Sequence, residues 1–330
     1  MSDPLHLLVP YAVCRSEGGQ HALQGLALPH LDGLLARLQP AAEASLSLDE
    51  DSPDMPHERA LARALGLPET PGRTPWAAWQ VQQQGQALGA EAWAFVTPCH
   101  WQVGTDHITL ADPQALGLDE DASRALLDIV GPWFAEDGIT LAYDQPTRWL
   151  AQGTLLAEVA TPSLERVQGQ DVRAWMQQAG RAPGLSPQAV RAAQTLQRLH
   201  SEMQMLLYTH PFNDARAAQG LAPVNAFWVH GAGRLPDAAR AMALPVPTQP
   251  QTLRDAALRA DWPGWARAWQ ALDAGPLAQM HAHVARGGSA RLTLCGERSA
   301  LSWHSAPRSL RQRIQGFLRP QRFTSLHNVL

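Results

Sequence analysis

The chain has 330 residues, of which 45% are hydrophobic and 17% are charged, and its net charge is −4 at neutral pH. These values predict a globular protein of one or two domains, and the small negative charge gives no general attraction to nucleic acid or anionic membranes. No apolar run approaches the roughly 18 residues that a membrane span needs, and the first residues make a poor secretion signal. Three widely spaced cysteines, Cys14, Cys99 and Cys295, predict reduced thiols in a cytoplasmic protein.

The N-terminal part of the chain predicts one buried strand and two helices. The continuous apolar run over residues 5–12 suits a buried strand, and such runs are typical of parallel sheets. Leucines along one side predict a helix over residues 28–40. The acidic, proline-broken segment 48–56 is predicted as an exposed loop, and the segment 57–67 as a second amphipathic helix.

The middle of the chain alternates predicted strands and helices, as a small α+β subdomain would. Segments 91–99 and 106–110 are predicted as the strands of one hairpin, with Gly104 in the turn between them. One helix and two further strands complete this block, over residues 119–132, 138–143 and 148–150.

The clearest predicted helix runs from residue 183 to residue 208, with Ser186 as its N-cap and Pro187 at its first position. A predicted polar loop follows, and then a short apolar strand over residues 227–229 that opens onto a glycine turn. Polar side chains at the C-terminal end of a buried strand are where open α/β sheets place ligands. The stretch 200–236 is therefore the first candidate for a functional site.

The C-terminal part predicts a tryptophan-lined helix and one more strand. Trp262, Trp265, Trp269 and Leu272 are spaced 3, 4 and 3 residues apart. That spacing is typical of a buried helix face rather than of a ligand-stacking surface. A further helix through His281 is predicted, followed by a strand over residues 290–295.

Five polar residues form the best candidate cluster: His210, Asn213, Arg216, Asn225 and His230. Arginine and histidine side chains bind phosphate or carboxylate groups, and asparagine can position either. The alternative is structural, with the two asparagines capping turns and the first histidine satisfying a helix C-terminus. The residues by themselves leave both interpretations open.

Three other patterns fit known kinds of site poorly. His281 and His283 are two positions apart, so on a helix they point about 200° apart and cannot share one metal ion. Cys99 and His100 are neighbours at a strand end and would face opposite ways. The glycine turn at residues 231–233 lacks the Lys-Ser/Thr of a Walker loop and the third glycine of a dinucleotide fingerprint.

The stretch from residue 210 to residue 233 resembles a motif of the archaeal-type cofactor-independent phosphoglycerate mutases, a family of the alkaline phosphatase superfamily. The residues that carry the resemblance are HPFNDAR at 210–216, Gly220, PVN at 223–225 and GAG at 231–233. Other stretches fall in the family's order: PHLDGL at 29–34, the helix at 60–67, the block from Trp93 to Arg148, and LTLCGE at 292–297 with His304. The stretches EMQMLLYTHP, VNAFW and LTLCGE are also similar to proteobacterial proteins of the RpfE type, a regulatory group.

This resemblance implies an α/β fold, an alkaline-phosphatase-like three-layer sandwich with an inserted small α+β subdomain. The core would be discontinuous, formed by residues 1–86 and 156–330, and the insertion would span residues 87–155. The family's mechanism uses a serine nucleophile and two metal ions held by Asp and His ligands. Its substrate-side residues would correspond here to Arg148, His210, Asn213, Arg216 and Asn225, with His230 beside the glycine turn.

The sequence departs from the family where the chemistry is expected. The first strand should end in Asp-Gly, but Pro10-Tyr11 follow it here. The nucleophile should precede the second helix, where Pro56-His57-Glu58 stand, and the late Gly-Asp-His is Gly296-Glu297-Arg298. An Asp-x-x-x-His motif expected near residue 260 is missing. These groups deprotonate the nucleophile and neutralise the charge of the transition state, and the two effects supply most of the rate enhancement. A chain without them is not expected to catalyse the reaction.

The leading hypothesis from the sequence is a non-catalytic regulatory or ligand-sensing protein derived from such a mutase, a pseudoenzyme with no cofactor. It would keep a pocket for a phosphorylated or carboxylate metabolite at Arg148, His210, Asn213, Arg216, Asn225 and His230, and it could have a protein partner. One alternative is an active phosphoglycerate mutase or phosphatase with rebuilt ligands, which would need Mn²⁺ or Zn²⁺. Another is a protein-interaction module without a small ligand.

Overall fold

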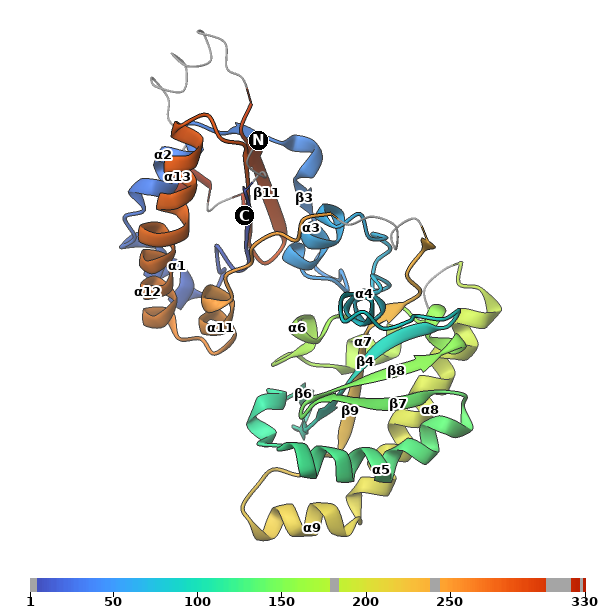
Figure 1. The fold of residues 1–330 in the computed structure, drawn as a ribbon. Helices are drawn as coiled ribbons and strands as arrows, with labels where there is room; N and C mark the ends of the chain where they lie inside the picture. The colour runs from blue at the N-terminus through green and yellow to red at the C-terminus, as the bar shows by residue number, and fades with distance from the viewer. Residues whose placement is uncertain (1–4, 179–183, 238–243, 307–321, 327–328) are drawn as a thin grey trace. The chain divides into compact units, whose positions relative to one another are not determined.

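The computed structural model describes residues 5–178, 184–237, 244–306, 322–326 and 329–330, and Figure 1 shows its ribbon. The chain forms two compact units. Unit 1 comprises Met1–Asp51, Met55–Gly66 and Leu244–Leu330, and unit 2 comprises Ser52–Asp54 and Leu67–Ala243. Their placement relative to one another is not determined, and each is described by itself. Both combine helices with strands, which confirms the predicted α/β class.

Unit 1 is organised around a five-stranded sheet in which β1 and β10 run parallel and the other pairs run antiparallel. Its strands, in sheet order, are β1 (Leu5–Val9), β10 (Ala290–Cys295), β11 (Ser299–His304) and β2 (Gln39–Pro40), with β3 (Leu46–Ser47) also paired to β11. Its helical segments are α1 (Glu17–Gln24), α2 (Pro29–Leu35), η1 (Ala42–Ala44), α3 (Pro56–Ala64), α11 (Thr252–Leu258), α12 (Trp262–Leu272), η4 (Asp273–Leu277), α13 (Ala278–Ala285) and α15 (Phe323–Leu326).

Both faces of this sheet are covered, so unit 1 has three layers. Alternate residues of a strand point to opposite faces. On one face, Leu7 and Val9 of β1 join the large core built with α2, α12 and α13. On the other face, Leu8 packs in a smaller cluster with Ala60 of α3.

The end of β1 is fixed by two buried tryptophans of α12. The indole N–H of Trp265 donates to the main-chain oxygen of Tyr11 at 2.9 Å, and that of Trp269 donates to Ala12 at 3.3 Å. Tyr11 has a φ of 52°, a left-handed conformation that costs free energy in a residue other than glycine. The predicted buried face of this helix is confirmed, since Trp265 and Trp269 are 0% exposed, and its hydrogen bonds help to hold the strained backbone.

Unit 2 is organised around a four-stranded antiparallel sheet of order β7-β8-β4-β9. Its strands are β4 (Ala92–Cys99), β7 (Thr140–Gln145), β8 (Arg148–Gly153) and β9 (Ala226–Gly233), with β5 (Trp101–Val103) and β6 (Ile108–Leu110) in a separate hairpin. Its helical segments are α4 (Trp76–Gln83), η2 (Pro113–Leu116), α5 (Glu120–Glu136), η3 (Thr154–Ala157), α6 (Leu164–Val167), α7 (Arg173–Gln178), α8 (Pro187–Tyr208) and α9 (Pro211–Ala218).

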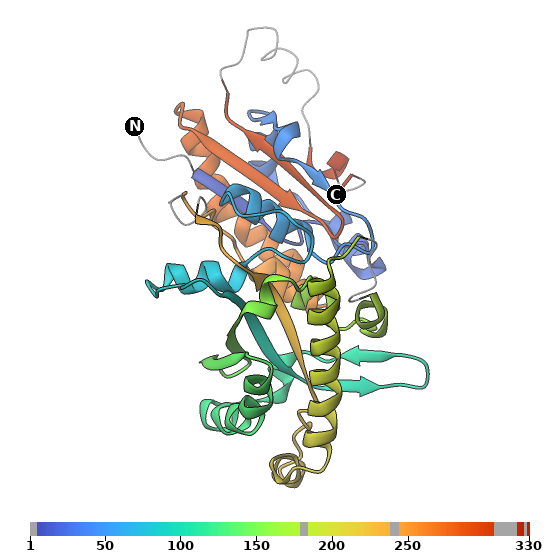
Figure 2. The same cartoon turned by 90° about the vertical axis from the view of Figure 1, so that its right-hand side faces the viewer.

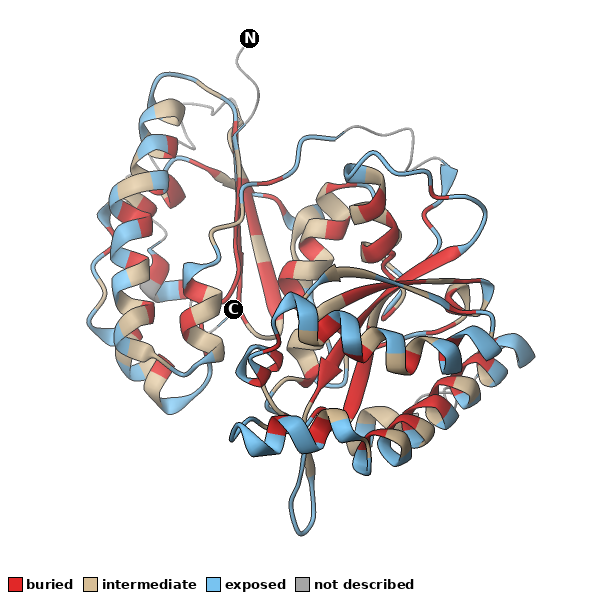
Figure 3. Cartoon of the chain, turned by 60° about the horizontal axis from the view of Figure 1, so that its bottom comes forward, coloured by how far each residue is buried: buried red, intermediate tan, exposed pale blue. Residues whose placement is uncertain are grey.

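Helices α5 and α8 bury one face of this sheet. Phe134 of α5 and Leu199 of α8 pack with Trp149, Phe227 and their neighbours in one core cluster. Figure 2 shows α8 as the long helix beside the sheet, and Figure 3 shows buried strands with outer helices that keep an exposed side. The predicted N-cap of α8 is confirmed, because the Ser186 hydroxyl accepts a hydrogen bond from the Ala189 N–H at 3.0 Å. No helix in the described ranges has the length and apolar character to cross a membrane.

One expectation about unit 2 needs revision. The predicted pairing of segment 91–99 with segment 106–110 is wrong, because β4 lies between β8 and β9 and the hairpin around Gly104 joins β5 to β6 instead. Unit 2 combines β4, β7 and β8 with α8 and β9, because β9 pairs with β4 and α8 packs on β9.

The tryptophan contacts at the end of β1 give a stability prediction. Trp265→Phe removes the donor to Tyr11 and leaves a space in a fully buried site, so we expect the free energy of unfolding of unit 1 to fall by about 2–3 kcal/mol. Trp262→Phe, on the partly buried side of the same helix, should cost less than about 1 kcal/mol. Urea unfolding followed by circular dichroism measures both, and equal losses in the two variants would contradict the assignment.

Candidate functional site

The segment after α8 is a helix rather than the predicted polar loop. Pro211 occupies the first position of α9, where its missing N–H costs nothing. The side chain of His210 is the N-cap, with its Nδ1 accepting from the Phe212 N–H at 3.1 Å. The prediction of a loop was wrong because a histidine cap is an unusual start signal beside Ser, Thr, Asp and Asn.

Asn213 is buried, and three hydrogen bonds engage its carboxamide. Its Nδ2 donates to the oxygens of Leu207 and Val224 at 2.8 and 2.7 Å, and its Oδ1 accepts from the Val224 N–H at 2.9 Å. These bonds join the end of α8 to the segment that leads into β9. The geometry therefore matches the structural interpretation of this asparagine.

Arg216 and Asn225 also bind main chain. The Arg216 guanidinium donates to the oxygens of Ala222 and Leu116 at 2.9 and 2.5 Å, and burial lowers its pKa. Asn225 accepts from the Trp101 N–H at 2.7 Å and donates to the Trp101 oxygen at 3.0 Å, much as a paired strand residue would. Together with Asn213, these residues connect α8, α9, β9 and β5.

The glycine turn at residues 231–233 is a β-bulge within β9 rather than an anion-binding loop at a strand end. Opposite β4, Phe95 pairs with His230 and Trp93 pairs with Gly233, so two residues of β9 face one residue of β4. Gly231 has a φ of 60°, and a Cβ there would lie 3.0 Å from the Cβ of Trp76. β9 belongs to an antiparallel sheet, in which it pairs with β4.

Arg148 and His230 form a second group, around Phe95. The ring of Phe95 lies 5.3 Å from the His230 ring and 4.8 Å from the Arg148 guanidinium carbon. The Nε and Nη2 atoms of Arg148 contact the Asp144 carboxylate at 2.7 Å, and Nη1 has no hydrogen-bond partner in the described part of the chain. The structure therefore separates the six predicted residues into two groups. Arg148 and His230 lie around Phe95, and the other four make hydrogen bonds to main chain at or near α9.

His230 is neutral at physiological pH. Its Nε2 lies 3.1 Å from the Thr97 hydroxyl, and burial together with the charge of Arg148 lowers its pKa to about 3. The charge of Glu165, on α6, acts in the opposite direction. A neutral imidazole adds no positive charge for an anion, so in this group only Arg148 supplies one.

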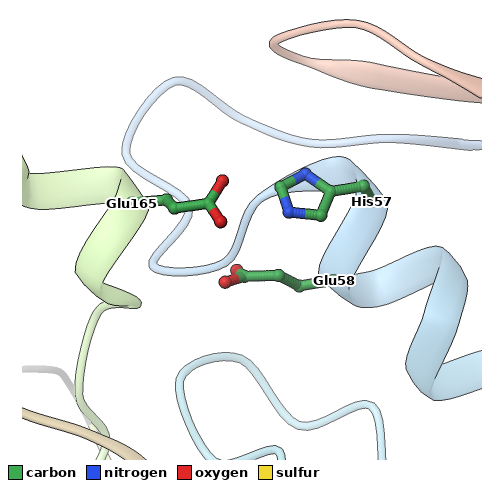
Figure 4. A group of neighbouring side chains, drawn as sticks. All are labelled: His57, Glu58 and Glu165. Carbon is green, nitrogen blue, oxygen red and sulfur yellow. The ribbon is translucent and has the colours of Figure 1, made fainter. Parts of the chain in front are cut away.

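The residues at the strand ends of unit 1 differ from those that the resemblance predicts there. Figure 4 shows His57 and Glu58 leaving the start of α3, where the resemblance places a serine. Glu58 accepts from the Met55 N–H at 2.7 Å and so caps its own helix, while the His57 ring lies 5.8 Å from that of Tyr11. Glu297, after β10, accepts from the Arg15 N–H at 3.1 Å.

The three cysteines and the histidine pair His281 and His283, which the sequence disfavoured as functional sites, lie in surroundings that suit a structural role. The three cysteines are free and buried, and burial raises the pKa of each thiol, that of Cys14 to about 12. Such thiols are poor nucleophiles at neutral pH. His281 packs near the ring of His30 at 6.3 Å, while the Nε2 of His283 lies 3.2 Å from the Ser289 oxygen.

A pocket that the sequence reasoning missed lies against β9, the edge strand of unit 2. It is open to solvent, and its walls come from α7, α8, the segment 159–162 and β9 itself. Thr161, Trp175, His200 and Trp228 line it. These residues are scattered over 68 positions of the sequence, so no local motif marked them.

No protein-family model matches the chain, and no curated protein sequence matches it. Two solved structures are similar to it over most of its length. One is a cofactor-independent phosphoglycerate mutase from Thermoplasma acidophilum, 13% identical, with a TM-score of 0.35 and 96% of each chain covered. The other is the PH0037 protein from Pyrococcus horikoshii, 11% identical, with a TM-score of 0.43 and coverage of 96% of this chain and 92% of that one.

The bonds of Asn213 give a second stability prediction. Asn213→Ala leaves two carbonyls and one N–H in a buried place without partners, so we expect a loss of about 3–5 kcal/mol in the free energy of unfolding of unit 2. Asp214→Ala, one position along on the exposed side of α9, should cost less than about 1 kcal/mol. Denaturant titration measures both, and a stable Asn213→Ala protein would argue against the structural role.

The lowered histidine pKa values predict a pH dependence. His230 and His200 have folded-state pKa values of about 3 and about 4, whereas both lie near 6.5 in an unfolded chain. Below pH 6.5 the unfolded chain binds more protons, so stability falls as the pH falls, by up to about 1.4 kcal/mol per pH unit for each histidine. His230→Phe should lessen the loss between pH 7 and pH 5 in urea titrations, and an unchanged loss would contradict the assignment.

Proposed function

We propose that this chain is a non-catalytic, ligand-binding regulatory protein descended from the cofactor-independent phosphoglycerate mutases. The observation that carries the proposal is the start of α3. There the resemblance places the nucleophile, and here Met55, Pro56, His57 and Glu58 stand, with the Glu58 carboxylate bound to its own helix at 2.7 Å. A hydroxyl nucleophile and free carboxylates for two metal ions are what phosphoryl transfer in that family requires.

The proposed ligand is a phosphorylated or carboxylate metabolite that meets Arg148. This guanidinium is held by Asp144 through one edge, its side chain is 27% exposed, and its Nη1 is unpaired among the described residues. Arg216 is unsuited to this role, because two carbonyl oxygens already take its donors in a buried place. A preorganised guanidinium with one free donor edge is a good contact for an oxyanion.

A cytoplasmic location belongs to the same proposal. It is supported by the three free, buried cysteines, since reduced thiols are the rule in that compartment. A regulatory protein of the RpfE type is the relationship that the stretches around residues 202–228 suggest.

The test combines an activity assay with a binding assay on the full chain. With Mn²⁺ or Zn²⁺ added, we expect no interconversion of 3-phosphoglycerate and 2-phosphoglycerate. We expect 3-phosphoglycerate to raise the melting temperature, since a ligand that binds only the folded state stabilises it, and Arg148→Ala to abolish the shift. Arg124→Ala is the matched control, because Arg124 also pairs with an acid, Glu120, and also stacks on a ring, at 4.0 Å from Tyr143.

Each outcome separates the candidate functions. Turnover that a chelator abolishes would replace the proposal by an active enzyme with rebuilt ligands. An unchanged melting temperature with 3-phosphoglycerate, pyruvate and inorganic phosphate would favour a protein-interaction module. A shift that both arginine variants lose equally would mean a general charge effect rather than a site at Arg148.

A further inference from the structure

The pocket beside β9 is walled almost entirely by apolar groups and carries no charge. Among its described lining residues there is no Asp, Glu, Lys or Arg. His200 is the one titratable group, and burial lowers its pKa to about 4, so it is neutral at physiological pH. A pocket without an opposite charge disfavours an ionised ligand, because removing a charge from water costs more free energy than apolar contacts recover.

Two lining residues have polar atoms that are left without partners. The Oγ1 of Thr161 and the Nδ1 of His200 are buried, and neither has a hydrogen-bond partner among the residues that the structure describes. Both residues are only 8% exposed. Such groups are rare in folded proteins because each costs about 1–3 kcal/mol, so each calls for an explanation.

The wall around His200 is aromatic. Its ring lies 4.4 Å from that of Phe227, 5.5 Å from that of Trp101 and 6.2 Å from that of Trp228. The indole N–H of Trp228 donates to the Pro162 oxygen at 3.0 Å, which fixes this side chain. Flat rings surround the imidazole on several sides, and flat ligands pack well against such walls.

The lining resembles that of small-molecule sites. Such sites typically combine apolar walls with a few polar groups that fix the orientation of the ligand. Here the polar groups come from two different elements, the segment 159–162 and α8, and they serve one pocket.

We propose that this pocket binds a small, uncharged, planar ring compound whose hydrogen-bonding groups pair with Thr161 and His200. Its apolar body would lie between Trp175 and Trp228, and its polar edge would supply the partners that the hydroxyl and the imidazole lack. The proposal is independent of the anion contact at Arg148, because Arg148 is not among the lining residues and the ligand is of the opposite kind.

Three uncharged heteroaromatic compounds serve as probes: indole, benzimidazole and quinazolin-4-one. The full chain is mixed with each, and binding is measured by thermal shift and by ligand-observed NMR at up to about 5 mM, a concentration suited to weak ligands of this size. We expect at least one compound to bind. Indole-3-acetate, which adds a negative charge to the same ring, should bind more weakly than indole.

Four variants locate the site. His200→Phe keeps a ring and Thr161→Val keeps the shape, and each should weaken binding about five- to tenfold through the loss of one hydrogen bond. Ala193→Phe places a ring in the pocket and should abolish binding. Met205→Ala, at a side chain of α8 that is 76% exposed, is the control and should bind as the wild type does.

The melting temperature of the ligand-free variants separates a binding role from a structural one. His200→Phe removes a buried polar atom without a partner, so the free protein should melt at the same or a higher temperature, whereas loss of a structural histidine would lower it. The proposal is overturned if none of the three compounds binds, if the two polar variants bind as tightly as the wild type, or if the anion binds more tightly than indole. If one polar variant fails to fold, the other decides.

Discussion

The carboxamide of Asn213 meets a strict requirement, since two main-chain oxygens and one N–H would otherwise be buried without partners. The bonds that satisfy them also set the point at which the chain enters β9. Asn225 continues this function by pairing with Trp101. At the far end, the bulge at Gly231 lets β9 pass close to Phe95 and Trp76. With both ends fixed, the free edge of β9 can form one wall of a stable pocket.

The sequence predicted the features that depend on local chemistry and periodicity. The tryptophan face of α12 and the Ser186 cap of α8 are examples, because a spacing or a single side chain determines them. It could not predict that β4 pairs with β8 and β9, since strand pairing depends on partners far apart in the chain. It also could not separate the two interpretations of Asn213, because a carboxamide that holds main chain and one that holds a ligand look the same in a sequence.

Two arginines show what decides whether a side chain is available to a ligand. Arg216 and Arg148 were predicted for the same pocket, and both are fully engaged on at least one edge of the guanidinium. The first donates to Ala222 and Leu116 in a buried place, so an anion would have to displace main-chain oxygens. The second stands at the start of β8 with a carboxylate on one edge and a donor to spare on the other. The residue type predicted the positive charge, but burial and the existing hydrogen bonds determine whether a ligand can bind to it.

The pairing of β1 with β10 has a consequence for how the protein is made. Leu5 pairs with Ala290, so two neighbouring strands of the sheet of unit 1 come from distant parts of the chain, with most of unit 2 between them in the sequence. During synthesis β1 has no neighbour in its sheet until β10 leaves the ribosome, whereas the four-stranded sheet of unit 2 is complete once β9 has emerged. Because domains generally fold as they appear, unit 2 should form first. The apolar β1 then stays without its strand partner until β10 has been synthesised.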